Sequence, residues 1–188
     1  MPKFDNFYIM GVDPGSRTLG VCMMELSPEL DIVSVSTHNV IIDSDDNVGM
    51  CENIVYRMRK LRFIIQSLYT IYNPAIISME SSFINASRMG AVIPLTKSIA
   101  LLESVLNELD RFIKMTTIPP SVIKKVFKAR QKGKEAVTEA LENNSELSHL
   151  VDVNKMSEHE IDATAIAFTL REYLKVNKGM MCIRYLQP

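Results

Sequence analysis

A chain of 188 residues, 47% of them apolar and 23% charged, has the size and composition of one globular domain, which excludes a disordered or fibrous protein. Its net charge of −1 gives no sign of a generally basic nucleic-acid-binding protein. Three cysteines without C-x-x-C spacing, an N-terminus without an apolar segment and no run of about 18 apolar residues predict a cytoplasmic protein with no disulfide framework, secretory signal or membrane span.

The first part of the chain predicts three antiparallel strands and a long helix. The strands are apolar runs separated by short turns, at 7–12, 19–26 and 31–42. Between 47 and 72 the apolar residues recur every three or four positions, which is typical of an amphipathic helix. Asn73-Pro74 is expected to end this helix.

The second part predicts two more strands among helices. Strands are expected at 75–80 and 114–118, and helices at 92–109, 121–128, 134–143 and 158–174. Ser157 followed three residues later by Glu160 is a capping-box pattern at the start of the last helix. Residues 175–188 show no clear period. Because no repeat or linker divides the chain, residues 1–188 are expected to form a single domain with its core at about 7–174.

Four potential metal ligands occupy the ends of these elements. Asp13 ends the first apolar strand, and Glu80 ends the strand at 75–80. His159 and Asp162 are three residues apart in the last helix, so their side chains emerge on one face. Because carboxylate ligands favour Mg²⁺ or Mn²⁺ over zinc, the four residues predict a phosphodiester-hydrolysing site with two ions about 4 Å apart.

Each of these residues also has an ordinary interpretation. Asp13 precedes a Pro-Gly turn, where an acid commonly bonds to its own backbone, and Glu80 is compatible with a strand end that faces water. His159 is compatible with a surface histidine beside the capping box, to which we assign Glu160. In the first turn of a helix the dipole disfavours an added positive charge, which favours the neutral imidazole that binds metal. Taken together, the four residues favour a metal site over four coincidences.

A basic segment follows the last predicted strand. It places six positive charges and no acid within eleven residues: Lys124, Lys125, Lys128, Arg130, Lys132 and Lys134. A run of this kind is compatible with an ordinary solvated face. Because the rest of the chain is net negative, we favour contact with nucleic-acid phosphates.

Three motifs resemble, in order, the signatures of the RuvC family of Holliday junction resolvases. Asp-Pro-Gly-Ser-Arg-Thr-Leu-Gly at 13–20 resembles the first, and Glu-Ser-Ser-Phe at 80–83 resembles the second. His-Glu-Ile-Asp-Ala-Thr-Ala-Ile-Ala at 159–167 resembles the last, although the family often has aspartate where this chain has His159. The resemblance covers about residues 7–174, and the three motifs together are much more specific than any one of them.

The resemblance implies an α/β protein with the RNase H-like fold, a mixed five-stranded sheet with helices on both faces. It implies a homodimer that cuts two opposing strands near the centre of a four-way DNA junction. Because the chain diverges from the family outside the motifs, we expect a phage-encoded member. Asp13, Glu80, His159 and Asp162 correspond to the catalytic ligands of Mg²⁺ or Mn²⁺. Because one ligand is His159, we predict that Mn²⁺ supports activity at least as well as Mg²⁺.

The resemblance also implies contacts with DNA. Phe83 corresponds to the side chain that the family places at the junction crossover, where stacking on a base offsets the cost of opening the junction; the alternative is a core residue. Asn85 and Arg88 follow it and are expected to contact backbone phosphates. Lys124 and Lys134 correspond to the key lysines of the family's phosphate-binding segment.

Two other functions remain open, and a third conflicts with the length of the chain. A broader debranching nuclease would also cut forks, flaps and three-way junctions. A junction-binding protein would bind DNA without cutting it, which the presence of all four ligands disfavours. Asp13-Pro-Gly15 also resembles the phosphate loop of actin-like sugar kinases, but 188 residues with seven glycines leave no room for the second domain and the adenosine site that those proteins need.

Overall fold

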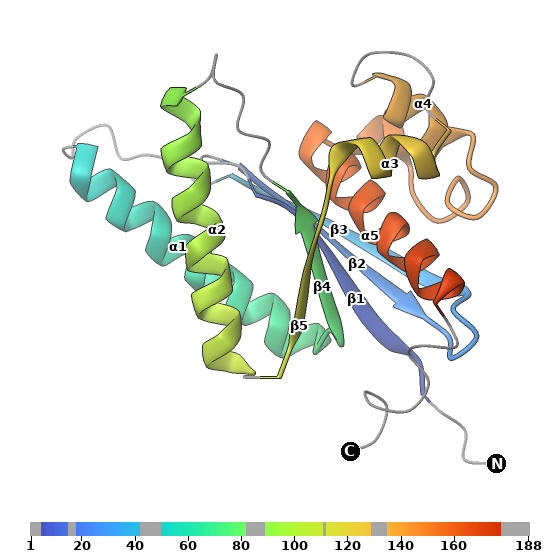
Figure 1. Ribbon diagram of the computed structural model, residues 1–188, viewed down its shortest axis with the longest axis horizontal. Coiled ribbons are helices and arrows are strands. Elements are labelled where there is room, and N and C mark those ends of the chain that lie inside the picture. The colour runs from blue at the N-terminus through green and yellow to red at the C-terminus, as the bar shows by residue number, and fades with distance from the viewer. Residues whose placement is uncertain are drawn as a thin grey trace.

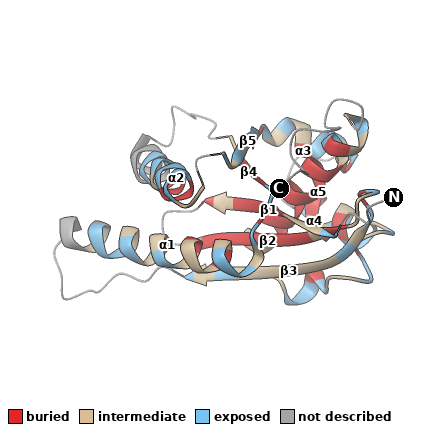
Figure 2. Cartoon of the chain, turned by 90° about the horizontal axis from the view of Figure 1, so that it is seen from below, coloured by how far each residue is buried: buried red, intermediate tan, exposed pale blue. Residues whose placement is uncertain are grey.

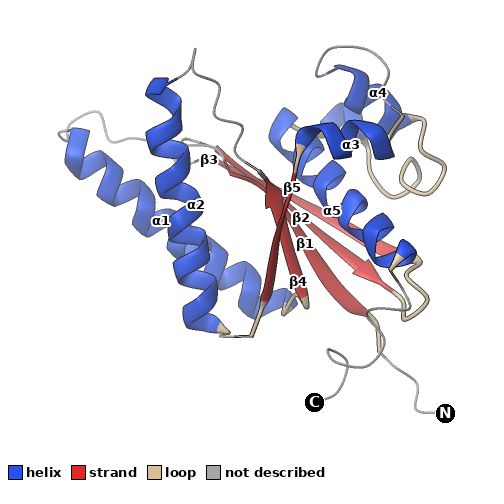
Figure 3. Cartoon of the chain, viewed as in Figure 1, coloured by secondary structure: helices blue, strands red, loops and turns tan. Residues whose placement is uncertain are grey.

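A computed structural model of the protein describes residues 5–14, 18–41, 50–81, 89–110, 112–128 and 135–177. They form a mixed five-stranded sheet between two layers of helices (Figures 1 and 3). The strands are β1 (Phe7–Pro14), β2 (Thr18–Leu26), β3 (Ile32–Ile41), β4 (Ile76–Glu80) and β5 (Lys114–Ile118). The order across the sheet is β3-β2-β1-β4-β5, with β1, β2 and β3 antiparallel and β4 and β5 parallel to β1.

The helices divide between the two faces of the sheet. One layer contains α1 (Met50–Tyr72) and α2 (Met89–Leu109); the other contains α3 (Pro120–Val126), α4 (Glu135–Glu142) and α5 (Glu158–Val176), with a short 3₁₀ turn at Val153–Lys155. Each layer has its own apolar core against the sheet. The buried residues are concentrated in the central strands and in α5 (Figure 2). No helix among the described residues is long and apolar enough to cross a membrane.

Alternation along β1 distributes its side chains between the two cores. Ile9 packs in the core beneath α5, whereas Met10 and Val12 pack in the core beneath α1 and α2. The central strands β1 and β2 are buried on both faces, which explains why they appear in the sequence as continuous apolar runs. The edge strand β3 is only half-buried and contains serine, threonine and histidine.

The predicted fold class and the order of elements are confirmed. The strand at 114–118 has the predicted bounds, and the other elements differ by a few residues at their ends. Helix α2 begins at Met89, three residues before its predicted start, and includes Pro94. Helix α5 continues to Val176. The 3₁₀ turn was not predicted, because three residues are too short to show a period.

Candidate active site

Asp13 and Glu80 occupy equivalent places on neighbouring parallel strands. Val12 of β1 pairs with Met79 of β4, and both side chains lie in the core beneath α1 and α2. Because successive side chains alternate between the faces of a sheet, the next residue of each strand, Asp13 or Glu80, faces the α5 side. The two acids therefore stand at the same end of the sheet, at the C-terminal ends of β1 and β4.

Helix α5 reaches this end of the sheet because a glycine lies beneath its first turn. Gly20 pairs with Asp13 in the β1–β2 ladder. A Cβ atom on Gly20 would overlap the His159 carbonyl oxygen and would come within 2.9 Å of the His159 Cβ. Gly11 is equally close to α5 further down the helix, where a Cβ would lie 2.7 Å from the Ala167 nitrogen. These glycines let the backbone of α5 rest directly on β1 and β2.

The structure brings together Asp13 and His159, which are 146 residues apart in the chain. Nδ1 of His159 lies 2.6 Å from Oδ2 of Asp13, within hydrogen-bonding distance. The Asp13 side chain is 14% exposed and the His159 side chain 36%, so the pair lies at the surface of the fold and is reachable from solvent. Two of the four predicted ligands are therefore in direct contact.

Asp162 lies on the side of α5 that faces β4 and β5. It precedes Tyr173 by eleven residues, which is about three helical turns. Tyr173 lines a cavity of about 350 Å³ together with residues of β5, which shows that this stripe of α5 faces the β5 edge. By this spacing Asp162 belongs to the same stripe of α5, near the start of the helix.

The donor chemistry of these four residues suits a divalent cation. Three carboxylates and one imidazole are ligands of Mg²⁺ or Mn²⁺. Within the described ranges, however, no three His, Cys, Asp or Glu side chains are grouped closely enough to hold a metal ion. The close contact of Asp13 is the hydrogen-bonding contact with His159. The two-metal site remains a prediction, for which Asp13, Glu80, His159 and Asp162 are the residues that would hold the ions.

The predicted capping box is present at the start of α5. The Ser157 hydroxyl accepts a hydrogen bond from the Glu160 backbone N–H, and the Glu160 carboxylate accepts one from the Ser157 N–H. Thr37 of β3 also donates to this carboxylate at 3.0 Å, a contact that the sequence did not predict. Burial by itself would raise the pKa of Glu160, but the hydrogen bonds from Ser157 and Thr37 outweigh it and lower this pKa.

Ser78 is a further residue near the site, and no pattern in the sequence points to it. It precedes Glu80 by two residues on the same face of β4 and pairs with Gly11. The side chain is fully buried, and its hydroxyl has no hydrogen-bond partner among the described residues. A small side chain fits at this position because α5 packs closely over the neighbouring Gly11.

The predicted DNA contacts are only partly covered by the described residues. Lys124, Lys125 and Lys128 are exposed, in α3 and just after it, and α3 begins two residues after the end of β5. Because β5 is parallel to β4, the segment that carries these lysines begins at the same end of the sheet at which Glu80 stands. Lys124 and Lys125 also lie in the last turn of α3, where cations stabilise the helix dipole. The remaining predicted contacts lie outside the described residues: Phe83, Asn85, Arg88, Arg130, Lys132 and Lys134.

Solved structures of Holliday junction resolvases share this architecture. RuvC of T. thermophilus, in complex with a Holliday junction substrate, is 16% identical over 90% of this chain and 96% of its own, with a TM-score of 0.69. The yeast mitochondrial Holliday junction resolvase Ydc2 is 15% identical, with a TM-score of 0.59 over 95% of this chain and 86% of its own. Fowlpox virus resolvase, in complex with its Holliday junction substrate, is 13% identical, with a TM-score of 0.53 over 89% of this chain and 99% of its own.

No protein-family model and no curated protein sequence matches the chain. At these identities the structural likeness establishes the fold. The chain has the RNase H-like fold of RuvC and of the two other Holliday junction resolvases.

Proposed function

We propose that this protein is a divalent-metal-dependent endonuclease that resolves four-way DNA junctions by paired phosphodiester hydrolysis near the branch point. The observation that carries the proposal is the meeting of Asp13 and His159 at 2.6 Å, at the end of the sheet where Glu80 also stands. The fold shared with three resolvases supports it, as do the three motifs that contain these residues.

The roles of the residues follow from their chemistry. The carboxylates of Asp13, Glu80 and Asp162 and the imidazole of His159 would hold Mg²⁺ or Mn²⁺, with oxygens of the DNA phosphate completing the ligand set of two ions. A bound ion of this kind lowers the pKa of water and stabilises the leaving oxygen of a phosphodiester. The packing of α5 on Gly20 supports the position of His159 beside Asp13.

DNA binding is assigned to two groups of residues. The lysines and arginine at 124–134 would bind backbone phosphates, and three of these lysines are exposed beyond the end of β5. Phe83, Asn85 and Arg88 belong to the segment that follows Glu80, so they would contact DNA beside the reacting phosphate. Asp13 and His159 are partly exposed at the surface, which allows a substrate as large as DNA to approach them.

A homodimer would provide the two sites that paired cuts require. Helix α1 exposes several large apolar side chains, among them Phe63 at 70% and Ile71 at 71% exposure. These two residues are eight positions apart, about two helical turns, so they lie toward the same side of α1. Exposed apolar side chains in such an arrangement support contact with a second copy of the chain.

The test is cleavage of an immobile four-way junction by the wild type and by Asp13→Asn, with Mg²⁺ or Mn²⁺. A linear duplex and a three-way fork of the same sequence are assayed in parallel. Asp152→Asn is the matched control, because Asp152 is an exposed acid that pairs with Lys155. We expect paired nicks in the four-way junction by the wild type and the control, and binding without cleavage by Asp13→Asn.

The other outcomes separate the alternatives. Equal cutting of the fork would indicate a debranching nuclease. Tight junction binding without cleavage by the wild type would indicate a binding protein and would contradict the proposed catalysis. Cleavage by Asp13→Asn at the wild-type rate would remove Asp13 from the catalytic site.

A further inference from the structure

The carboxylate of Glu160 joins the start of α5 to strand β3. One oxygen, Oε2, accepts hydrogen bonds from the Ser157 backbone N–H at 2.9 Å and from the Ser157 hydroxyl at 2.8 Å. The other oxygen, Oε1, accepts a hydrogen bond from the Thr37 hydroxyl at 3.0 Å. A capping box requires only the bonds with Ser157. The Thr37 contact is therefore an additional link between elements that lie 123 residues apart in the chain.

This link acts on the helical turn that carries two of the candidate ligands. His159 directly precedes Glu160, and Asp162 follows it by two residues. Because the residues of one helical turn are rigidly spaced around the axis, a rotation of this turn moves both ligands together. A bond from Glu160 to β3 restrains that rotation.

A second pair of contacts lies one turn further along α5. The Thr164 hydroxyl donates to the Glu160 carbonyl oxygen at 2.7 Å, and the buried Cys22 of β2 lies next to Thr164. Burial raises the pKa of Cys22 to about 12, so the thiol stays protonated and acts as a small packing group. Cys22 pairs with Thr37 in the sheet, so neighbouring residues of β2 and β3 lie beneath successive turns of α5.

We propose that Thr37 and Glu160 are positioning residues whose hydrogen bond holds His159 and Asp162 in place relative to Asp13 and thereby sets the affinity of the site for a divalent cation. The inference rests on the metal-dependent function proposed above and adds residues that act through the helix. Outer groups that orient metal ligands commonly change metal affinity by tenfold or more when they are removed.

The experiment compares Thr37→Val with Thr37→Ser in the full chain. Valine keeps the shape of threonine and removes the hydroxyl, whereas serine keeps the hydroxyl. Ser34→Ala is the control, because it removes a hydroxyl-to-carboxylate bond from the same strand, to Glu25 at 2.7 Å. Mn²⁺ affinity is measured by calorimetry without DNA, and hydrogen exchange of the amides at 157–162 is measured in the metal-free protein.

We expect Thr37→Val to bind Mn²⁺ about tenfold more weakly and to exchange these amides faster, and Thr37→Ser and Ser34→Ala to match the wild type. Unchanged Mn²⁺ affinity in Thr37→Val, with a wild type that binds the ion, would overturn the inference. A wild type that binds no Mn²⁺ would instead contradict the proposed function. The two failures are therefore distinguishable.

Glu160→Gln separates positioning from direct ligation. The glutamine amide retains an acceptor for Ser157 and offers its NH₂ group to the Thr37 hydroxyl, so the geometry is kept while the charge is removed. We expect its Mn²⁺ affinity to stay within about threefold of the wild type, since the bond to Thr37 is retained. A loss as large as that of Thr37→Val would make Glu160 a ligand and would overturn its positioning role.

Discussion

Gly20 of β2 lies directly beneath His159 of α5, and its lack of a side chain allows His159 to take this position. Gly20 is also the ladder partner of Asp13. The contact is between backbones, because the atom nearest to a Cβ at this position would be the His159 carbonyl oxygen. Backbone atoms cannot rotate away as a flexible side chain can. The absence of a Cβ at Gly20 is therefore a condition for the contact between Asp13 and His159.

Gly20→Ala is expected to displace the first turn of α5. We predict a loss of about 2–3 kcal/mol in the free energy of unfolding, measured with urea, because the overlap must be relieved by moving the helix. Mn²⁺ affinity should fall as well. Gly11→Ala is the comparison, since it overlaps α5 near Ala163 and Ala167, and it should cost similar stability with a smaller effect on Mn²⁺ binding. Wild-type stability in Gly20→Ala would contradict this close packing.

Lys124→Ala combined with Lys134→Ala tests the phosphate contacts. Each lost contact should reduce the slope of log affinity against log salt concentration by about 0.9, so the double variant should lose about 1.8. Four-way junction binding is measured by fluorescence anisotropy at several salt concentrations. Lys155→Ala is the control, because Lys155 is paired with Asp152 at 2.8 Å. An unchanged slope in the double variant would refute the assignment.

Phe63→Asp combined with Ile71→Asp tests the proposed dimer contact on α1. A carboxylate buried in an apolar interface is strongly unfavourable. We therefore expect the wild type to be a dimer and the double variant a monomer at micromolar concentration. Light scattering after gel filtration measures the mass. Val176→Asp is the control, because Val176 is 85% exposed on α5, which lies on the opposite face of the sheet. A monomeric wild type would leave paired incision in need of another explanation.

The sequence predicted the features that depend on neighbouring residues. Apolar runs bounded by turn residues located the five strands, and the spacing of Ser157 and Glu160 located the start of α5. Long-range contacts could not be predicted in this way. The bond from Thr37 to Glu160 joins residues whose local patterns give no sign of each other. Gly20 belonged to the motif at 13–20, and its packing against α5 became apparent only in the folded chain.

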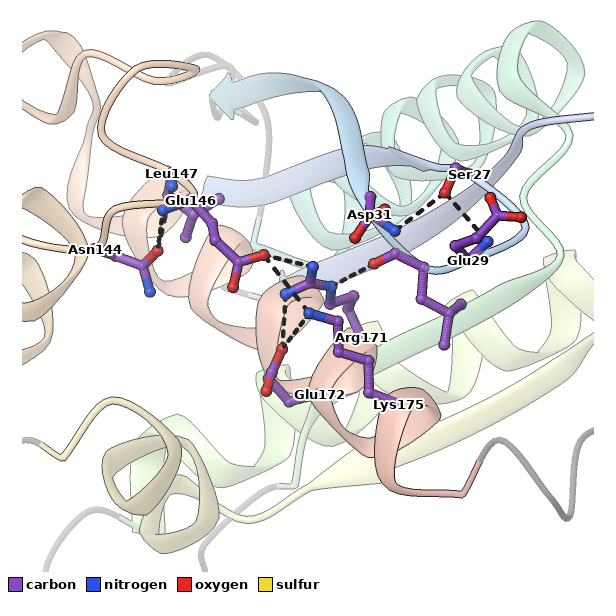
Figure 4. A network of polar contacts seen from close by, with 10 residues as sticks. Ser27, Glu29, Asp31, Asn144, Glu146, Leu147, Arg171, Glu172 and Lys175 are labelled. Atoms are coloured by element: carbon purple, nitrogen blue, oxygen red, sulfur yellow. Dashed lines mark hydrogen bonds and ion pairs between the residues drawn. The ribbon is translucent and has the colours of Figure 1, made fainter.

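Arg171 is a further feature that periodicity alone did not predict. Its side chain is fully buried near the end of α5, where an arginine would ordinarily be expected at the surface. Figure 4 shows it between Glu146 and Glu172, which it contacts at 2.5 and 2.7 Å. Its Nε also donates to the Leu30 carbonyl oxygen at 2.7 Å. These contacts join α5 to the β2–β3 turn and to the segment after α4, far from the candidate active site.

The Glu146 contact makes a specific contribution to stability that depends on pH. The hydrogen bond from Arg171 is the main cause that holds the pKa of Glu146 below its ordinary value of 4.5, against the opposing effect of burial. Because the folded-state pKa is below that of the unfolded chain, the stabilisation is complete above about pH 4.5 and is lost as the pH falls through the lower folded-state value.

Glu146→Gln should therefore be less stable than the wild type at pH 7, and the difference should shrink in acid. The side chain of Glu146 is 45% exposed, so solvent screens the pair and we expect a difference of about 1 kcal/mol at pH 7. Urea unfolding at intervals from pH 7 to pH 3 measures it, with Glu139→Gln, an exposed acid of α4, as the control. A difference that stays constant down to pH 3 would show that the charge of Glu146 is not its source, because protonation removes that charge from the wild type alone.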